Sequence, residues 1–286
     1  MIGRFRLMFS GSPSIWLGAK KSESLLRIPS IKSKFAIGAL AGVALLVAAS
    51  TASFAATAWT YTGATGPSHW KTVDPTNYAT CVDGTAQSPI NIEKPVKTDL
   101  TNLKFSYVKS EAGIFNNGHT VEAEPMGTEK SSVTIDGTVY NFAQFHFHAP
   151  SEHEINGMHY PVEIHFVNKS DAGKLAVVGV FIKAGAANAE WKAFTDKLTT
   201  ATEDPEATKV ELEWSKLLPT SKTTLRYDGS LTTPGCTEGV KWNVMTHPIT
   251  MSQAQINQFL EAYSGNNRPV QPLHGRVVKL DSTSAK

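Results

Sequence analysis

Basic charge is scarce in most of this chain. The whole sequence carries 27 lysine and arginine residues against 25 aspartate and glutamate residues. Residues 1–55 hold 7 of the basic and 1 of the acidic residues, which leaves 20 and 24 for the rest, a net charge of −4. Because no basic run follows residue 55, the composition argues against a nucleic-acid partner.

Residues 35–70 contain no lysine, arginine, aspartate or glutamate. The chain is basic before this stretch, apolar from Phe35 to Ala49, and then offers a small-x-small cleavage site at 53–55. This order is typical of a secretory signal, and the apolar run is short for a membrane span. We predict a leader over residues 1–55, cleaved near Ala55. The mature periplasmic or secreted domain is then residues 56–286, not stably inserted in a membrane. An uncleaved membrane anchor is the alternative.

Only two cysteines are present, Cys81 and Cys236. In an exported protein an even pair favours a disulfide over two separate buried thiols. The loop closed by this bridge is long, so the chain-entropy model gives a stabilisation of about 4–5 kcal/mol, less any native strain.

No repeat, low-complexity tract or linker divides residues 60–280, which excludes several domains. Alternating or near-continuous apolar residues predict strands, and the apolar run 175–182 suits a central strand buried on both faces. The fold class is therefore mostly β, with short helices. Strands are expected at 103–107, 120–124, 132–135, 138–148, 175–182 and 240–244. Helices are expected at 188–200 and from Ser252, which could cap it, to Tyr263, with Ile256, Phe259 and Leu260 as the apolar face.

The sequence Gln144-Phe145-His146-Phe147-His148 alternates in polarity. In a strand, residues two apart point the same way, so His146 and His148 share a face with Gln144, and the phenylalanines face a core. The same parity puts Glu163 beside His165.

Turn-type residues, Pro150 and Asn156-Gly157, lie between these two runs and predict a hairpin. The hairpin would bring His146, His148 and His165 together as metal ligands. Three neutral nitrogen ligands leave one position of tetrahedral Zn²⁺ open, as a catalytic site requires. Gln144 and Glu163 would then accept hydrogen bonds that fix the imidazole tautomers. His153 and His159 are rival ligands, but surface or loop hydrogen bonding is the better interpretation of both.

Short motifs in a fixed order make the mature chain resemble the α-class carbonic anhydrases over nearly its whole length. They are Trp-x-Tyr at 59–61, Gly-Pro-x-His-Trp at 66–70, Gln-Ser-Pro-Ile at 87–90, Asn-Asn-Gly-His at 116–119, Gln-Phe-His-Phe-His at 144–148, Ser-Glu-His at 151–153, Glu-x-His at 163–165, Gly-Ser-Leu-Thr-Thr-Pro at 229–234, Arg-Pro at 268–269 and Gln-Pro-Leu at 271–273.

The resemblance implies a central, twisted, mainly antiparallel sheet with short peripheral helices. It also implies Zn²⁺ on His146, His148 and His165, and reversible hydration of carbon dioxide to bicarbonate and a proton. The attacking group would be a zinc-bound hydroxide. Thr232 would accept a hydrogen bond from this hydroxide and donate one to Glu152.

The resemblance further implies roles around the zinc. His119 would carry protons out of the cleft, because an imidazole titrates near neutrality. Tyr61 and Asn117 would order water between metal and His119. The contacts to substrate would come from Val121, Val177, Leu231, Thr233, Val240 and Trp242.

Three features depart from the family pattern. Ala149 follows the histidine pair where an aromatic residue is common, and Glu122 stands where the cleft usually has a neutral residue. Pro234, Gly235 and Cys236 replace a more apolar stretch. We expect these departures to affect efficiency and inhibitor preference rather than activity.

Two alternatives remain at this point. A cupin would use His146, His148 and Glu152 as ligands, with iron or manganese. A non-catalytic, exported zinc-binding protein could have the same fold. A homodimer is also possible.

Overall fold

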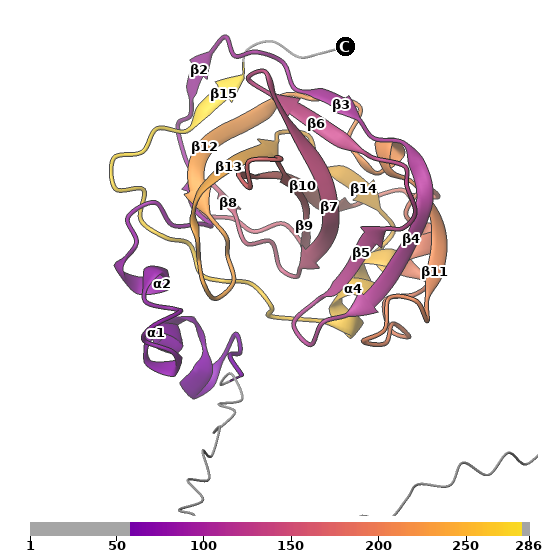
Figure 1. The fold of residues 1–286 in the computed structure, drawn as a ribbon, viewed down its shortest axis with the longest axis horizontal. Helices are drawn as coiled ribbons and strands as arrows, with labels where there is room; N and C mark the ends of the chain where they lie inside the picture. The colour runs from indigo at the N-terminus through magenta and orange to yellow at the C-terminus, as the bar shows by residue number, and fades with distance from the viewer. Residues whose placement is uncertain (1–57, 282–286) are drawn as a thin grey trace, which may run out of the picture. The chain divides into compact units, whose positions relative to one another are not determined.

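The computed structural model describes residues 58–281 (Figure 1). These residues form one mostly β unit, as the alternating patterns predicted, with short helices around a large sheet. The predicted leader over residues 1–55 and its cleavage point lie outside the described residues. Between residues 58 and 281, no helix is long and apolar enough to cross a membrane.

The large sheet is twisted and mainly antiparallel, as expected; the parallel pairs within it join β10 to β13, β10 to β14 and β15 to β2. Its strands lie in the order β11 (Lys209–Glu213), β4 (Lys109–Asn116), β5 (Val121–Pro125), β7 (Thr138–His148), β9 (Val162–Lys169), β10 (Leu175–Ala184), β13 (Glu238–Met245), β12 (Thr224–Ser230), β15 (Lys279–Asp281) and β2 (Val96–Thr98). Off this path lie β14 (Ile249–Met251), β6 (Ser132–Ile135) and β3 (Lys104–Ser106). A separate small sheet pairs β1 (Asn91–Ile92) with β8 (Glu154–Ile155).

Strand β10 is buried on both faces, as its apolar run predicted. It pairs with β9 on one side and with β13 on the other, and residues 176–182 are buried. Val178 and Val180 belong to one apolar core, whereas Val177 and Phe181 belong to a second core on the opposite face. Each such buried side chain stabilises the fold by about 1.5–3 kcal/mol. The face of Val177 and Phe181 is the one that carries the histidines described below.

The helices are short and lie around the sheet. The last of them follows the predicted pattern closely: Ser252 is its N-cap and forms a capping box with Gln255. Ile256 and Phe259 are buried, as predicted. Leu260 is 38% exposed, so the prediction that it belongs to the buried face was wrong. The helices are α1 (Trp70–Val73), α2 (Thr80–Asp83), α3 (Lys192–Thr195) and α4 (Gln253–Ala262), with 3₁₀ turns η1 (Gly63–Thr65), η2 (Pro67–His69) and η3 (Trp214–Leu217).

The helix predicted over residues 188–200 is wrong in extent. Only α3 is helical there, and turns complete the segment. Trp191, Phe194 and Leu198 are nevertheless all buried. The apolar spacing therefore predicted correctly which residues are buried. It did not predict the secondary structure, because successive turns can bury the same positions as a continuous helix.

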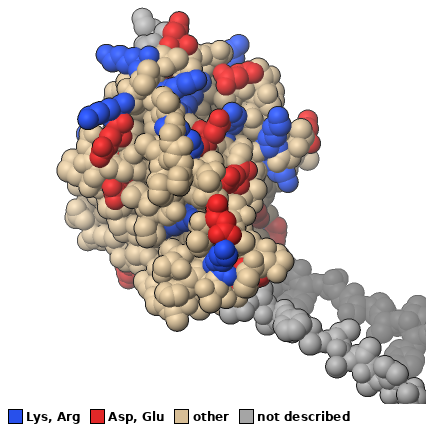
Figure 2. Space-filling view, turned by 90° about the vertical axis from the view of Figure 1, so that its left-hand side faces the viewer, with Lys and Arg blue, Asp and Glu red and all other residues tan. Residues whose placement is uncertain are grey.

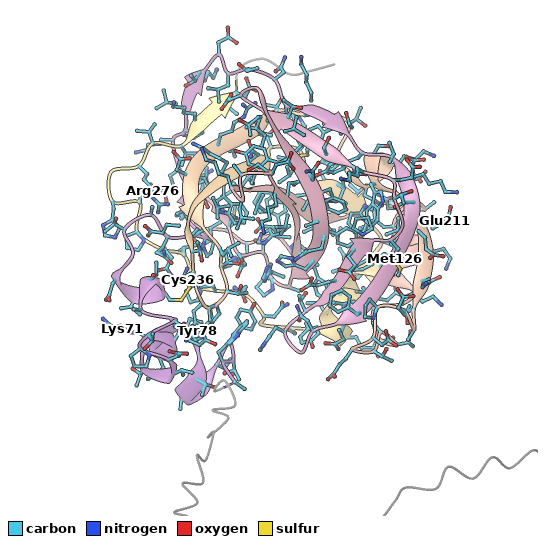
Figure 3. The ribbon with its side chains drawn as sticks, viewed as in Figure 1. Lys71, Tyr78, Met126, Glu211, Cys236 and Arg276 are labelled. Atoms are coloured by element: carbon cyan, nitrogen blue, oxygen red, sulfur yellow. A yellow bond between two sulfur atoms is a disulfide. The ribbon has the colours of Figure 1, made fainter. Side chains whose placement is uncertain are left out.

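A disulfide joins Cys81 to Cys236, which confirms the predicted pairing. Cys81 lies in α2, and Cys236 lies in the loop between β12 and β13. Figure 3 shows Cys236 beside the N-terminal helices. Both cysteines pack with the buried ring of Trp70 in a small third core. The bridge thereby attaches the N-terminal segment to the loop that carries Thr232.

Surface charges of both signs are interspersed. On the face drawn in Figure 2, lysine and arginine side chains alternate with aspartate and glutamate and form no continuous basic surface. Several of them pair, such as Lys71 with Asp83 and Lys241 with Asp228, both at 2.7 Å. This mixed surface agrees with the charge balance of the sequence.

Candidate metal centre

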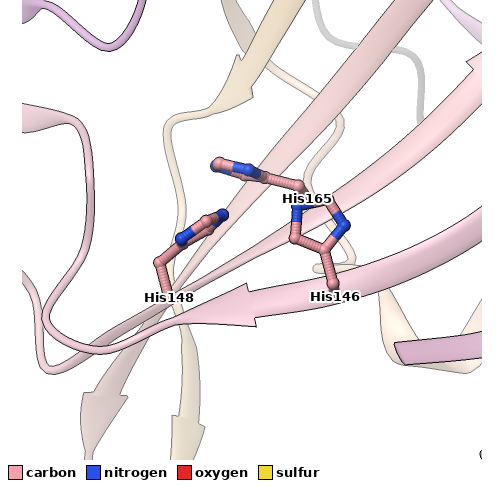
Figure 4. Close-up of side chains that lie close together, drawn as sticks. All are labelled: His146, His148 and His165. Carbon is pink, nitrogen blue, oxygen red and sulfur yellow. The ribbon is translucent and has the colours of Figure 1, made fainter. Parts of the chain in front are cut away.

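Two neighbouring strands bring three histidines to one face of the sheet. β7 and β9 run antiparallel, with His146 opposite His165 and His148 opposite Glu163. Residues opposite each other in such a pair project to the same face. Figure 4 shows His146 and His148 on β7 and His165 on β9, with their rings turned toward one another. Their ring centroids are 4.6–5.4 Å apart.

Two of the imidazoles have one nitrogen held by an acceptor. Nδ1 of His146 donates to Oε1 of Gln144 at 2.9 Å, and Nδ1 of His148 donates to the backbone oxygen of Asn266 at 2.7 Å. Nε2 of His165 lies 3.0 Å from Oε1 of Glu163, without the geometry of a hydrogen bond. The acceptors place the protons of His146 and His148 on Nδ1, and the nearby carboxylate favours a proton on Nε2 of His165. The lone pairs are left on Nε2 of His146, Nε2 of His148 and Nδ1 of His165.

These three histidines offer a set of nitrogen atoms that fits a metal ion. Ligand atoms of the three residues lie within 4.8 Å of one another. Nε2 of His148 is buried and has no hydrogen-bond partner among the described residues, which is costly for a buried polar atom unless a further group binds it. Three imidazole nitrogens on one side of an ion suit tetrahedral Zn²⁺ with one position open. The residues therefore fit zinc.

Burial favours the neutral, ligating form of these side chains. It lowers the pKa of His146 well below its ordinary value, and the neighbouring His148 and His165 lower it further. Burial likewise lowers the pKa of His148 to about 4 and lowers that of His165, against the opposing charge of Glu163. All three imidazoles are thus neutral at physiological pH.

The two rival histidines have other partners. His153 is fully buried, not on the surface as one interpretation allowed. Its Nδ1 donates to Oε1 of Glu163 at 2.7 Å, and its Nε2 accepts from the hydroxyl of Tyr227 at 2.6 Å. His159 is exposed, and its Nδ1 donates to the backbone oxygen of Ser151 at 2.7 Å. Neither residue has the free, inward-facing lone pair of the other three.

Glu163 does more than orient His165, which sequence reasoning did not foresee. Its Oε2 accepts from the backbone amides of Glu152 and His153 at 2.9 and 2.8 Å. Burial alone would raise the pKa of Glu163, but His153 and His165 outweigh it and hold the pKa well below the ordinary value. Glu163 is therefore an ionised carboxylate that fixes both the loop after β7 and the imidazole of His165.

Glu152 is the second buried carboxylate beside the histidines. Its Oε1 accepts from the backbone amide of Arg268 at 2.7 Å, and its Oε2 lies 3.9 Å from Nδ1 of His165. Burial raises the pKa of Glu152 to about 7, while His165, the Arg268 amide and the hydroxyl of Thr232 act in the opposite direction. Glu152 and Thr232 thus lie close together beside the histidines.

A comparison with protein families agrees with this geometry. The family model described as eukaryotic-type carbonic anhydrase matches residues 65–282. The chain belongs to the α-class carbonic anhydrases. This enzyme family acts on carbon dioxide and bicarbonate. The membership confirms the resemblance that the sequence motifs indicated, and it excludes the cupin fold.

Individual relatives cover the same part of the chain. A carbonic anhydrase of Klebsiella pneumoniae is 43% identical over 221 residues, which are 77% of this chain and 89% of the relative. The α-carbonic anhydrase of Thermovibrio ammonificans, solved with the inhibitor sulfanilamide, is 41% identical with a TM-score of 0.71, over 78% of this chain and 99% of its own. Dioscorin, solved with ascorbate, is 30% identical with a TM-score of 0.70, over 78% of this chain and 97% of its own.

A small cavity of about 30 Å³ adjoins His146 and His165. Its apolar wall includes Val177, Leu231 and Trp242, as predicted for contacts to substrate, and Thr232 and Thr233 also line it. His146 and His165 close it on the metal side. An apolar cavity beside these histidines suits a small, uncharged molecule.

Two of the predicted substrate contacts lie elsewhere. Val121 packs in the core on the opposite face of the sheet, because its neighbour Glu122 is the residue paired with His146. Val240 is buried in the second core with Val177 and Trp242 but does not line the cavity. Val167 lines the cavity instead. It follows His165 by two residues, so strand parity could have identified it.

His119 lines a second cavity, which is open. Its ring stacks on Trp59, with centroids 3.6 Å apart, and both residues line an open cavity with Tyr61 and Tyr263. Tyr61 reaches toward the metal centre, with its ring centroid 6.5 Å from that of His148. Partial burial lowers the pKa of His119 below its ordinary value.

Asn117 holds the turn that carries His119. Its Oδ1 accepts from the backbone amides of His119 and Thr120, both at 2.9 Å. Its Nδ2 donates to Oε1 of Glu122. Glu122 sits opposite His146 in the register, so the unusual carboxylate lies on the metal face, and burial raises its pKa.

Proposed function

We propose that His146, His148 and His165 hold Zn²⁺ and that the protein hydrates carbon dioxide reversibly to bicarbonate and a proton. The observation that carries this proposal is the group of three buried or part-buried histidines whose ligand atoms lie within 4.8 Å of one another, two of them with the opposite nitrogen held by an acceptor. Zinc, when bound in such a site, supplies a hydroxide nucleophile at neutral pH because it lowers the pKa of water.

Thr232 and Glu152 would orient the nucleophile. Oε1 of Glu152 already accepts from Arg268, which leaves Oε2 to accept the hydroxyl proton of Thr232. With its proton committed to Glu152, Oγ1 of Thr232 can only accept a hydrogen bond from the attacking group. That requirement directs a lone pair of the nucleophile toward the substrate.

The apolar cavity would hold carbon dioxide next to the nucleophile. Val167, Val177, Leu231 and Trp242 exclude water from the reacting carbon and make no hydrogen bonds to the substrate. The hydroxyl of Thr233 lies at the same cavity, where it can contact the bicarbonate product. Val240 would support the wall through Trp242.

His119 would carry the proton away. Its imidazole lines an open cavity, where it would take a proton from water and pass it to buffer. Tyr61 lines the same cavity and lies 6.5 Å from the ring of His148, so it would order this water. Asn117 would act by holding the turn rather than by touching the water.

Stopped-flow carbon dioxide hydration, with metal analysis of the same preparation, tests the proposal. We expect one zinc per chain, rapid hydration and inhibition by a sulfonamide. Bound zinc without hydration would favour a non-catalytic binding protein, and the solved complex of dioscorin with ascorbate makes ascorbate binding the next measurement. A preparation without zinc would overturn the ligand assignment.

Export is a separate proposal. The Cys81–Cys236 disulfide suits an oxidising compartment, and the basic, apolar and small residues before residue 56 have the order of a secretory signal. Mass spectrometry of the protein from the periplasm or medium should show an N-terminus near residue 56. An intact chain that begins at Met1 would contradict cleavage.

A further inference from the structure

Gly179 interrupts the apolar run of β10 at the metal centre. It lies directly opposite His165 on β9 and opposite Val244 on β13. A glycine inside a strand costs about 0.5–1 kcal/mol compared with alanine, so this position needs a reason. Its φ is not among the positive values of the chain, so the backbone itself does not require glycine.

The reason is a close approach by Glu163. A Cβ atom built at Gly179 would lie 3.0 Å from Oε1 of Glu163, which is closer than an ordinary contact. The next atoms, Cγ2 of Val244 at 3.5 Å and Cζ3 of Trp242 at 3.8 Å, would make ordinary van der Waals contacts. An alanine here would therefore conflict with the carboxylate and with nothing else nearby.

Glu163 has no free direction in which to yield. Its Oε1 contacts Nδ1 of His153 at 2.7 Å and Nε2 of His165 at 3.0 Å. Its Oε2 accepts from the amides of Glu152 and His153, and the whole residue is fully buried. A shift of a few tenths of an ångström would lengthen at least one of these four contacts.

We propose that Gly179 is a positioning residue for the metal centre: its missing side chain leaves the space in which Oε1 of Glu163 contacts His165 and His153 together. The inference rests on the proposed zinc site. Gly179 acts through Glu163, which sets the tautomer and direction of the His165 ring. It touches neither the metal nor the substrate.

The test is zinc affinity of Gly179→Ala, measured by competition with a chelator. Loss of a group that orients a ligand costs about 10–100-fold in metal affinity, and we expect about tenfold for a displaced carboxylate. The visible spectrum of the cobalt-loaded variant should also change, because the direction of His165 changes. Zinc affinity and a cobalt spectrum equal to those of the parent would overturn the proposal.

Gly185→Ala is the matched control. A Cβ at Gly185 would lie 3.0 Å from Cβ and Cγ2 of Thr250, the same distance, just beyond the end of β10. It is not near the histidines, and we expect parental zinc affinity and an unchanged cobalt spectrum. A loss equal to that of Gly179→Ala would attribute the effect to strand packing and contradict the proposal.

A double-mutant cycle with Glu163→Ala separates the two roles and covers the case in which Gly179→Ala alone does not fold. Once the carboxylate is absent, a methyl group at 179 has space, so Gly179→Ala should add less than twofold to the loss caused by Glu163→Ala. Additive losses would refute action through Glu163. If the parent protein bound no zinc, the proposed function itself would fail, before any difference at Gly179 was compared.

Discussion

The backbone oxygen of Asn266 accepts a hydrogen bond from Nδ1 of His148 at 2.7 Å, while the side chain of the same residue ties three segments together. Its Oδ1 accepts from the amide of Ala149 at 2.8 Å, and its Nδ2 donates to the backbone oxygens of Phe147 and His119. One residue thus holds the ring of His148, the end of β7 and the turn that carries His119.

Asn266→Ala should lower the free energy of unfolding by about 1–3 kcal/mol. The substitution leaves the buried amide of Ala149 unpaired, which costs about 1–3 kcal/mol, whereas the backbone oxygen of Phe147 keeps its hydrogen bond from the hydroxyl of Thr120. Urea denaturation of the metal-free protein measures the change. The contact to His148 comes from the backbone and survives, so zinc should still bind; a variant of parental stability would contradict this account.

His146→Ala should abolish zinc binding and hydration together. Two remaining imidazoles hold the ion poorly, so the affinity should fall by more than the roughly 100-fold that loss of an orienting group costs. Metal analysis after dialysis and stopped-flow hydration provide the two readouts. His159→Ala, which removes a histidine outside the group, is the control, and a zinc-loaded, active His146→Ala would refute the assignment.

His119→Ala should slow the proton-transfer step by about 10²-fold and leave zinc content unchanged. Added imidazole buffer should restore the rate, because it replaces the missing proton carrier. Hydration is measured at rising imidazole concentration, with the parent enzyme alongside. Full activity without rescue would remove His119 from the mechanism.

The pKa of His119 should lie below the ordinary value of 6.5 in the folded protein, because partial burial disfavours the charged ring. An NMR titration of its Cε1 proton measures this pKa. The unfolded chain then binds more protons below about pH 6.5, so His119 contributes a loss of stability as pH falls through this range. A pKa above 6.5 would show that another charge dominates burial.

Replacing both cysteines by serine should lower the free energy of unfolding by about 4–5 kcal/mol, as the chain-entropy model gives for a bridge across 155 residues. The same change should reduce hydration, because the amide of Cys236 donates to Thr233 in the loop that carries Thr232. Denaturation and hydration are measured with and without a reductant. A variant with parental stability would contradict a bracing role.

Glu122→Gln should bind anionic inhibitors such as thiocyanate more tightly. Removing one negative charge on the metal face removes a repulsion of about 1 kcal/mol, or about fivefold in affinity, at the effective dielectric of a partly exposed site. The amide oxygen of glutamine can still accept from Asn117, so the turn stays in place. The inhibition constants of the parent and of Glu122→Gln are compared at pH 8. Equal constants would show that the charge of Glu122 does not affect anion binding.

Strand parity explains which parts of the site could be predicted from the sequence. It placed His146, His148 and His165 on one face because alternation depends only on position along a strand. The same rule reached Gln144 and Glu163, and it would have reached Val167. Parity does not apply in loops, which is why His153 was not recognised as a buried partner of Glu163.

Other features depend on contacts between distant segments. The register of β9 against β10 places Gly179 opposite His165 and close to the carboxylate of Glu163, and no local pattern contains that register. The bond from the amide of Arg268 to Glu152 joins residues 116 positions apart. The extent of the segment 188–200 also depended on packing, because burial of its apolar residues does not distinguish a helix from successive turns.

The proposed metal ligands come from one hairpin, whose outermost histidines are His146 and His165. Thr232, Arg268 and Cys236 belong to segments synthesised after it. During translation, the hairpin is therefore complete before the groups that hold Glu152 and Thr232 have been synthesised. Contacts that are local in sequence also form early in folding. The order of the segments along the chain thus allows the three histidines to bind a metal ion before Thr232 and Arg268 are in place.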